Sequence, residues 1–228
     1  QTNHMKPIVL LLLVLGLNAN AQESFKVKRS EVVFTSFSES DASAVNAVED
    51  AKFKEIIIDN KMEQADFDLL CNTLDWITKM KIKPRSKSIT NIGAIANLKA
   101  LVEFEVDGLT GSKENALDLE VFSGLGNLQK LNLRSTKVKN TDALKTNNLL
   151  EELLLFKSDA PSLDFMASTP ELRIVDLFGN TIIEDYSPLA QLTKLEELTL
   201  TFNSNLTDEQ LAPLQAISTL KSIDLASC

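Results

Sequence analysis

A short pattern of leucines recurs along the chain and limits what it can fold into. The stretch "LEELLLFKS" at 150–158 is followed by "LRIVDLFGN" at 172–180, and both fit the template L-x-x-L-x-L-x-x-N. Four consecutive copies are in register: Leu128, Leu131, Leu133 with Thr136; Leu150, Leu153, Leu155 with Ser158; Leu172, Val175, Leu177 with Asn180; Leu195, Leu198, Leu200 with Asn203. The pattern therefore indicates an internal repeat.

Weaker copies extend the repeat in both directions. Their apolar positions are Phe53, Ile56, Ile58; Ile77, Met80, Ile82; Leu101, Phe104, Val106; and Leu220, Ile223, Leu225 with Cys228. Successive fourth template residues are then 24, 24, 27, 22, 22, 23 and 25 positions apart. About eight units of this length and pattern are typical of leucine-rich repeats.

Such repeats predict an α/β solenoid. Each unit contributes one short strand, and stacking pairs the strands into a curved parallel sheet on the concave face, with helices, 3₁₀ turns and loops on the convex face. In "MEQADFDLLCNTLDW", Phe67, Leu70, Cys71 and Leu74 fall at helical spacing, so we expect a helix there with Cys71 as a small buried residue. The 22-residue units leave room only for a turn or a 3₁₀ segment.

Two stretches resemble known bacterial families. The segment "EIIIDNKMEQADFDLLCNTLDWITKMKI" resembles the N-terminal repeats of BspA-like surface proteins of Bacteroidetes-type bacteria, and "IIEDYSPLAQLTKLEELTLTFN" resembles internalin-type repeats. The resemblance implies an extracytoplasmic protein that binds partners. Leucine-rich repeats serve unrelated functions, so it implies no particular partner.

The first residues have the layout of a secretory signal. From Met5 the chain reads "MKPIVLLLLVLGLNANAQ", a lysine and an apolar run followed by Ala19-Asn20-Ala21, which predicts cleavage before Gln22. The apolar run covers only about half of a bilayer core, so we expect no membrane insertion after cleavage. Residues 1–21 are thus interpreted as upstream residues plus a signal peptide, and the mature chain as secreted, periplasmic or on the cell surface.

The rest of the chain divides into a cap and the repeats. Residues 22–50 are expected to form an N-terminal cap, with strands in "FKVKRSEVVF" and a helix over 42–51 capped by Ser40 or Asp41. Residues 51–228 hold the repeats. Because the chain stops halfway through a repeat, we expect the natural protein to be longer.

Charge and cysteine usage narrow the classes of partner. Without residues 1–21 the chain has 22 basic and 32 acidic residues, a net charge of −10. This acidity disfavours nucleic acid, which is bound through clustered Lys and Arg. Cys71 and Cys228 are too few for a disulfide scaffold and should lie too far apart in the solenoid to pair.

The template also predicts which side chains point outward from the sheet. Lys79, Lys81 and Lys83 on one strand should lie beside Glu103, Glu105 and Asp107 on the next. A cross-strand ladder that neutralises both sets is the favoured interpretation. The alternative is an anion site for a sulfated glycan or a lipid phosphate.

The same template places aromatic residues on the outward face. Phe156 and Phe178 occupy one column on neighbouring strands, with Leu154 beside them and Phe202 one position further along. An apolar patch among charges is the usual anatomy of a binding hot spot. The predicted partner-binding residues are Leu154, Phe156, Phe178, Phe202, Arg134 and Asp176. Alternatively, the rings merely stack on one another or lie under a loop or another domain.

Catalytic and cofactor motifs are missing from the mature sequence. It has no histidine, no CxxC pair and no glycine-rich phosphate loop, so we expect no enzyme activity, no metal and no cofactor. The sequence predicts an exported binding module that takes a protein or glycan ligand on its concave face, with adhesion to host or neighbouring cells as one role. The alternative is a structural spacer in a larger surface protein whose active domain lies beyond residue 228.

Overall fold

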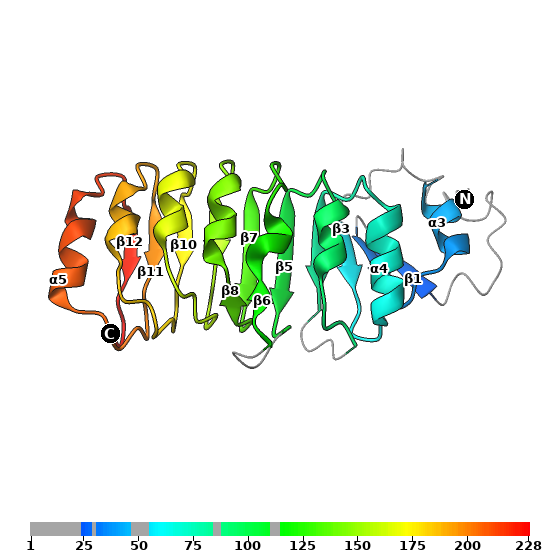
Figure 1. The fold of residues 1–228 in the computed structure, drawn as a ribbon, viewed down its shortest axis with the longest axis horizontal. Coiled ribbons are helices and arrows are strands. Elements are labelled where there is room, and N and C mark those ends of the chain that lie inside the picture. The colour runs from blue at the N-terminus through cyan, green and yellow to red at the C-terminus, as the bar shows by residue number, and fades with distance from the viewer. Residues whose placement is uncertain (1–23, 29–30, 47–54, 84–87, 110–114) are drawn as a thin grey trace, which may run out of the picture.

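One long sheet organises the molecule. The computed structural model describes residues 24–28, 31–46, 55–83, 88–109 and 115–228. Among them, ten strands form a single sheet (Figure 1) in the order β1 (Phe25–Lys28), β2 (Glu31–Phe34), β3 (Glu55–Ile58), β4 (Lys79–Ile82), β5 (Glu103–Asp107), β7 (Lys130–Arg134), β9 (Glu152–Leu154), β10 (Ile174–Asp176), β11 (Glu197–Thr199) and β12 (Ser222–Asp224). Every pair from β2 to β12 is parallel, as the repeat predicts, and β1 pairs antiparallel with β2.

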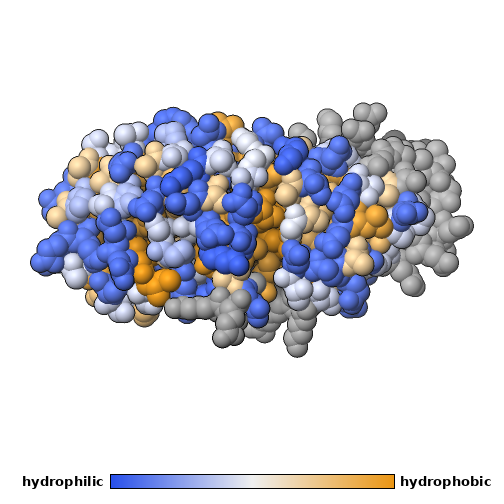
Figure 2. All heavy atoms as spheres, in the orientation of Figure 1, coloured by the Kyte–Doolittle hydropathy of each residue, from blue (hydrophilic) through white to orange (hydrophobic). Residues whose placement is uncertain are grey.

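The helices and turns lie on one side of the sheet (Figure 1). They are α3 (Glu39–Asn46), α4 (Gln64–Thr73), α5 (Asp208–Leu211) and the 3₁₀ segments η2 (Gly93–Asn97), η4 (Leu119–Phe122), η5 (Thr141–Thr146), η6 (Asp164–Ser168), η7 (Ser187–Gln191) and η8 (Ala212–Ala216). A small second sheet pairs β6 (Leu117–Asp118) with β8 (Val138–Lys139). The shortest units carry 3₁₀ segments rather than α-helices because they have too few residues between strands. Figure 2 shows that hydrophilic residues dominate this side.

The core lies between the sheet and the helices. The template leucines supply it, and Leu131, Leu153, Val175 and Leu198 are at most 2% exposed. Ile223 and Leu225, predicted to be interior, are 40% and 36% exposed; they lie on or just after β12, which among the described strands pairs only with β11. Phe53, the first template residue, lies outside the described residues.

A ladder of side-chain hydrogen bonds joins successive repeats. In four repeats the residue at the asparagine position donates to a carbonyl of the preceding repeat, at or just after the end of its strand: Ser158 Oγ to Leu133 O (2.6 Å), Asn180 Nδ2 to Leu155 O (2.6 Å), Asn203 Nδ2 to Leu177 O (3.0 Å) and Cys228 Sγ to Leu200 O (3.0 Å). An amide, a hydroxyl and a thiol thus perform the same task, which is to give a backbone carbonyl a side-chain donor from the next repeat. Thr136 differs, since its Oγ1 donates to Arg134 O of its own repeat (3.1 Å) and accepts from the Leu109 amide (3.2 Å).

The predicted helix of the first repeat is confirmed. In α4, Phe67, Leu70 and Cys71 are buried. Burial, helped by the nearby Asp68 carboxylate, raises the pKa of the Cys71 thiol, which keeps it protonated and unreactive. Cys71 and Cys228 are both free thiols, as expected.

The N-terminal region corrects one prediction. Helix α3 begins at Glu39, and Ser38 is the capping residue rather than Ser40 or Asp41. The Ser38 amide donates to Asp41 Oδ2 (3.0 Å) and the Asp41 amide donates to Ser38 Oγ (3.4 Å), a reciprocal pair at the helix start. The predicted signal peptide lies outside the described residues, and none of the helices within them has the length and apolarity that a membrane span requires.

The ladder yields a stability prediction. Asn180 is fully buried; its Oδ1 accepts from the Ala160 amide (3.1 Å) while its Nδ2 donates to Leu155 O. In Asn180→Ala both backbone groups lose their partner, so the free energy of unfolding should fall by about 2–4 kcal/mol. Urea denaturation measures this. Asn127→Ala is the control, because its single bond to Lys99 O is exposed and its loss should cost less than about 1 kcal/mol.

Candidate binding face of the sheet

We call the side of the sheet that points away from the helices the sheet face. Outward side chains at the same template position of successive strands form columns on it. Strand register pairs Glu55, Lys79, Glu103, Lys130, Glu152, Ile174, Glu197 and Ser222 in one column, and Ile57, Lys81, Glu105, Asn132, Leu154, Asp176, Thr199 and Asp224 in the next. The columns match those read from the template because a slip of one residue would turn the leucines to solvent.

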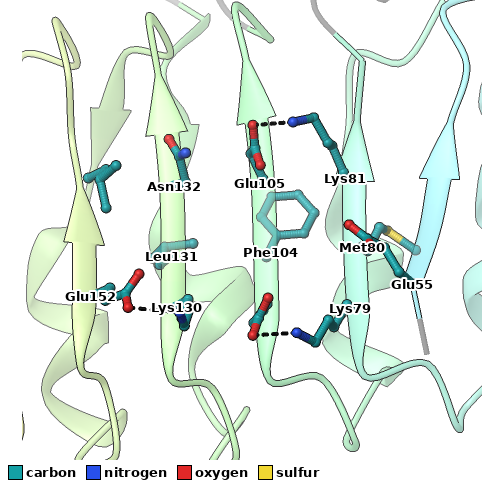
Figure 3. A pocket seen from close by; sticks show the side chains of 12 residues that line it. Glu55, Lys79, Met80, Lys81, Phe104, Glu105, Lys130, Leu131, Asn132 and Glu152 are labelled. Carbon is teal, nitrogen blue, oxygen red and sulfur yellow. Dashed lines mark hydrogen bonds and ion pairs between the residues drawn. The ribbon is translucent and has the colours of Figure 1, made fainter. Parts of the chain in front are cut away.

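The predicted charge ladder is confirmed in two of its three pairs, between β4 and β5, and one more ion pair joins β7 to β9. Lys79 pairs with Glu103 (2.7 Å), Lys81 with Glu105 (2.6 Å) and Lys130 with Glu152 (2.7 Å). Figure 3 shows Lys81 and Lys130 each reaching a carboxylate on a neighbouring strand. The hydrogen bond to Glu152 raises the pKa of Lys130. Lys83 differs from the prediction. It pairs with Asp59, which directly follows β3 (2.6 Å), rather than with Asp107, which ends β5.

A shallow hollow lies over this ladder (Figure 3). Its charged lining residues include Lys79, Lys81 and Lys130, each of which is already paired with a carboxylate. A ligand that entered it would have to break those ion pairs. Leu154 also lines this hollow.

Three rings and a guanidinium form a row further along the sheet face. The rings of Phe156 and Phe178 stack with centroids 4.3 Å apart and planes 14° apart, and Phe202 follows with its centroid 5.0 Å from that of Phe178. Arg134 Cζ lies 4.5 Å from the Phe156 centroid, at the other end of the stack. We call Arg134, Phe156, Phe178 and Phe202 the aromatic row. The structure therefore brings these four predicted site residues together.

Phe202 reaches the row through an unusual backbone conformation. The template assigns the outward position to Thr201, but Thr201 is buried and Phe202 extends outward instead, with φ +60° and 53% of its area exposed. The same position of other repeats also has positive φ and is held by Gly108, Ser135, Lys157, Gly179 and Ser227. A bulky ring is disfavoured there. A strained and exposed aromatic residue is a mark of a functional site.

A second hollow adjoins the row and was missed by sequence reasoning. It is lined by Lys137, Lys157, Asp159, Phe178, Gly179, Thr181 and Phe202. Lys157 Nζ lies 5.6 Å from the centroids of both Phe156 and Phe178, while Lys137 pairs with Asp159 (2.8 Å). A Cβ on Gly179 would come within 3.0 Å of Lys157 Cγ, so the glycine gives the lysine stem room to cross. Lys157 and Gly179 occupy the same left-handed position in successive repeats. The residue that follows the outward phenylalanine in each repeat is therefore the sequence signal by which they can be found.

Asp176 supports the row rather than joining it. Its Oδ1 accepts a hydrogen bond from the Phe178 amide (2.9 Å). The carboxylate thus fixes the turn that carries Phe178. Of the other predicted site residues, Asp176 thus contacts the row through the Phe178 amide, and Leu154 lines the hollow over the charge ladder.

Comparisons with known proteins support the fold. No family model matches the chain, and a search of curated proteins also finds no match. Among solved structures, internalin C2 of Listeria monocytogenes superposes with a TM-score of 0.64 at 19% identity, covering 95% of this chain and 90% of that one. The chain has the leucine-rich repeat fold. The likeness confirms the architecture that the internalin resemblance implies.

Other leucine-rich repeat structures match a smaller share of their own length. Another L. monocytogenes internalin has a TM-score of 0.62 at 20% identity, with 84% of this chain covering 51% of that one. The ectodomain of the Arabidopsis thaliana receptor kinase GASSHO1/SCHENGEN3, solved in complex with CASPARIAN STRIP INTEGRITY FACTOR 2, has a TM-score of 0.54 at 14% identity, with 77% of this chain covering 24% of that one. The chain thus spans about half or less of these two proteins.

The Asp59–Lys83 pair predicts a pH dependence. Partial burial raises the pKa of Asp59, but the hydrogen bond and charge of Lys83 outweigh it and hold the pKa below its usual value. A lowered pKa contributes stability above the unfolded-state pKa of about 4, and this contribution is lost as the pH falls through the folded-state pKa. The stability difference between wild type and Asp59→Asn should therefore be largest near neutral pH and shrink in acid. Urea titrations at a series of pH values measure it. Lys83→Gln should flatten the profile similarly, and a constant difference would contradict the assignment.

The backbone of Phe202 yields a second prediction. Asparagine tolerates the left-handed conformation better than phenylalanine, and this gain of about 1 kcal/mol should offset the loss of the ring contact with Phe178. Phe202→Asn should therefore melt within about 4 °C of wild type by circular dichroism. The control is Phe122→Ala, which removes a buried ring and should cost about 3–5 kcal/mol. A comparable loss in Phe202→Asn would make that ring part of the core.

Proposed function

We propose that this chain is a non-enzymatic binding module that takes a protein partner on its sheet face, at the aromatic row. The observation that carries the proposal is the row itself, in which an exposed and strained Phe202 continues a stack of half-buried rings. A cluster of exposed aromatic residues promotes aggregation unless a partner covers it, so such a cluster on a folded surface favours a binding role.

The geometry of the rings favours a protein over a glycan. Sugars bind to aromatic residues through an open ring face, but Phe156 and Phe178 cover each other's faces and Arg134 covers the far side of Phe156. The row therefore presents ring edges and one exposed ring, which suits apolar side chains. The complex of the GASSHO1/SCHENGEN3 ectodomain with CASPARIAN STRIP INTEGRITY FACTOR 2 is an example of this fold holding a partner.

Pairing of the surface charges supports a role without catalysis. Glu103, Glu105 and Glu152 are each held by a lysine of a neighbouring strand, an arrangement that neutralises carboxylates instead of exposing them as acids or bases. In this proposal the protein acts outside the cytoplasm, including in adhesion to other cells. That part depends on the signal-like residues before Gln22.

The double variant Phe156→Ala/Phe178→Ala tests the proposal. The full chain is immobilised and exposed to envelope and secreted proteins of neighbouring or host cells, and affinity is then measured for each purified protein that it captures. Removal of two hot-spot rings should weaken a genuine partner by about 100-fold or more.

Two controls separate binding from stability. Met80→Ala destabilises the core on β4, far from the row, and should keep its affinity. Lys79→Gln/Lys81→Gln changes the charges of the hollow over the ladder and should also leave the affinity for the partner unchanged. Equal affinity of the double variant and wild type would reject the row as the binding site and favour the alternative of a structural spacer.

A further inference from the structure

The basic side chains of the sheet face fall into two groups. Lys79, Lys81, Lys83 and Lys130 each form an ion pair with a carboxylate of an adjacent strand. Arg134 and Lys157 form none with any residue that the structure describes; both lie against phenylalanine rings instead. Between β3 and β12, the cations of the sheet face that form no ion pair with a described residue are therefore the two at the aromatic row.

The position of Arg134 shows that this difference is not a lack of nearby carboxylates. Asp107 lies opposite Arg134 in the strand register, yet the guanidinium lies over the Phe156 ring. On a chain with a formal net charge of −9, the guanidinium of Arg134 and the ammonium of Lys157 thus remain available to an anionic group of a partner. Charge complementarity favours an anionic group in the partner.

The partner that supplies this anionic group must also have an apolar group close to it. Lys157 Nζ is 5.6 Å from two ring centroids, and its stem passes Gly179 into the hollow that Phe178 and Phe202 line. A carboxylate paired with Lys157 would therefore lie beside the rings. The apolar side chain that covers Phe202 must then be a near neighbour of the acidic residue in the partner.

We propose that the aromatic row binds an acidic peptide segment in which an Asp or Glu adjoins an aliphatic or aromatic residue. This proposal rests on the proposed function and specifies the chemistry of the partner. A sulfated glycan would satisfy Arg134 and Lys157 but would leave the Phe202 ring, 53% exposed, in water. A peptide satisfies both requirements at once.

The test uses random linear peptides displayed on phage and selected on the full wild-type chain. Peptides that the Phe156→Ala/Phe178→Ala variant does not retain are synthesised in two forms, as selected and with Asp and Glu replaced by Asn and Gln. Fluorescence polarisation then gives their affinities. We expect the acidic form to bind wild type roughly three- to tenfold more tightly than the amide form, with the difference reduced by added salt.

Variants of the two cations complete a double-mutant cycle. In Arg134→Gln/Lys157→Gln the two peptide forms should bind equally, because the charges that distinguish them are gone. Glutamine makes the same backbone demand as lysine at the left-handed position of residue 157. In the control Lys79→Gln/Lys81→Gln the preference for the acidic form should remain.

Each contrary outcome has a separate meaning. Peptides that need Phe156 and Phe178 but show no acidic preference would overturn this inference and leave the proposed function standing. If neither peptides nor captured proteins depend on those two rings, both proposals fail. If a heparin fragment binds wild type, needs Lys157 and displaces the peptides, while peptides alone show no acidic preference, the ligand is a sulfated glycan and the inference is wrong.

Discussion

No single repeat of this chain can bury its own leucines, and everything else in the structure follows from that constraint. Leu153 is shielded only because the neighbouring units stack on either side of it, and the ladder bonds from Ser158 and Asn180 reach back to carbonyls of the preceding unit. Stability is therefore shared between neighbours along the axis. At the edge strand β12, which among the described strands pairs only with β11, Ile223 and Leu225 are correspondingly more exposed.

Because the interior positions set the register, the outward positions are free to differ between repeats. Along the carboxyl ends of the strands they change from the Asp59–Lys83 ion pair, through Arg134, to the stacked rings of Phe156 and Phe178. One scaffold thus carries a neutralised charged region and an aromatic region on the same face. The two regions differ in what they can offer a partner: the first has used its charges internally, whereas the second has not.

The repeat template was sufficient to predict the parallel sheet, the columns of the sheet face and the placement of Phe156 beside Phe178 on neighbouring repeats, because all three depend only on a period and an alternation. It failed where the backbone leaves the strand. The exchange of Thr201 and Phe202 depends on a left-handed residue that the template does not encode, and Lys157 and Gly179 were missed for the same reason. Lys83 pairs with Asp59 and not with Asp107. Both neighbouring repeats offer a carboxylate to the same ammonium group, and the sequence alone does not show which one binds it. The capping role of Ser38 was likewise a matter of local hydrogen-bond geometry.

The backward direction of the ladder bonds has a consequence for how such a chain changes over evolutionary time. Each of the last four units carries a side-chain donor for a carbonyl of its predecessor, so duplication or deletion of one of these units creates a junction in which a donor again meets a carbonyl at the same position. The number of repeats can therefore change while the fold of each repeat stays the same. A duplicated unit that includes Phe178 would lengthen the ring stack by one strand spacing of about 4.8 Å, so that recombination between copies could adjust the reach of the surface toward a longer or shorter ligand without inventing a new core.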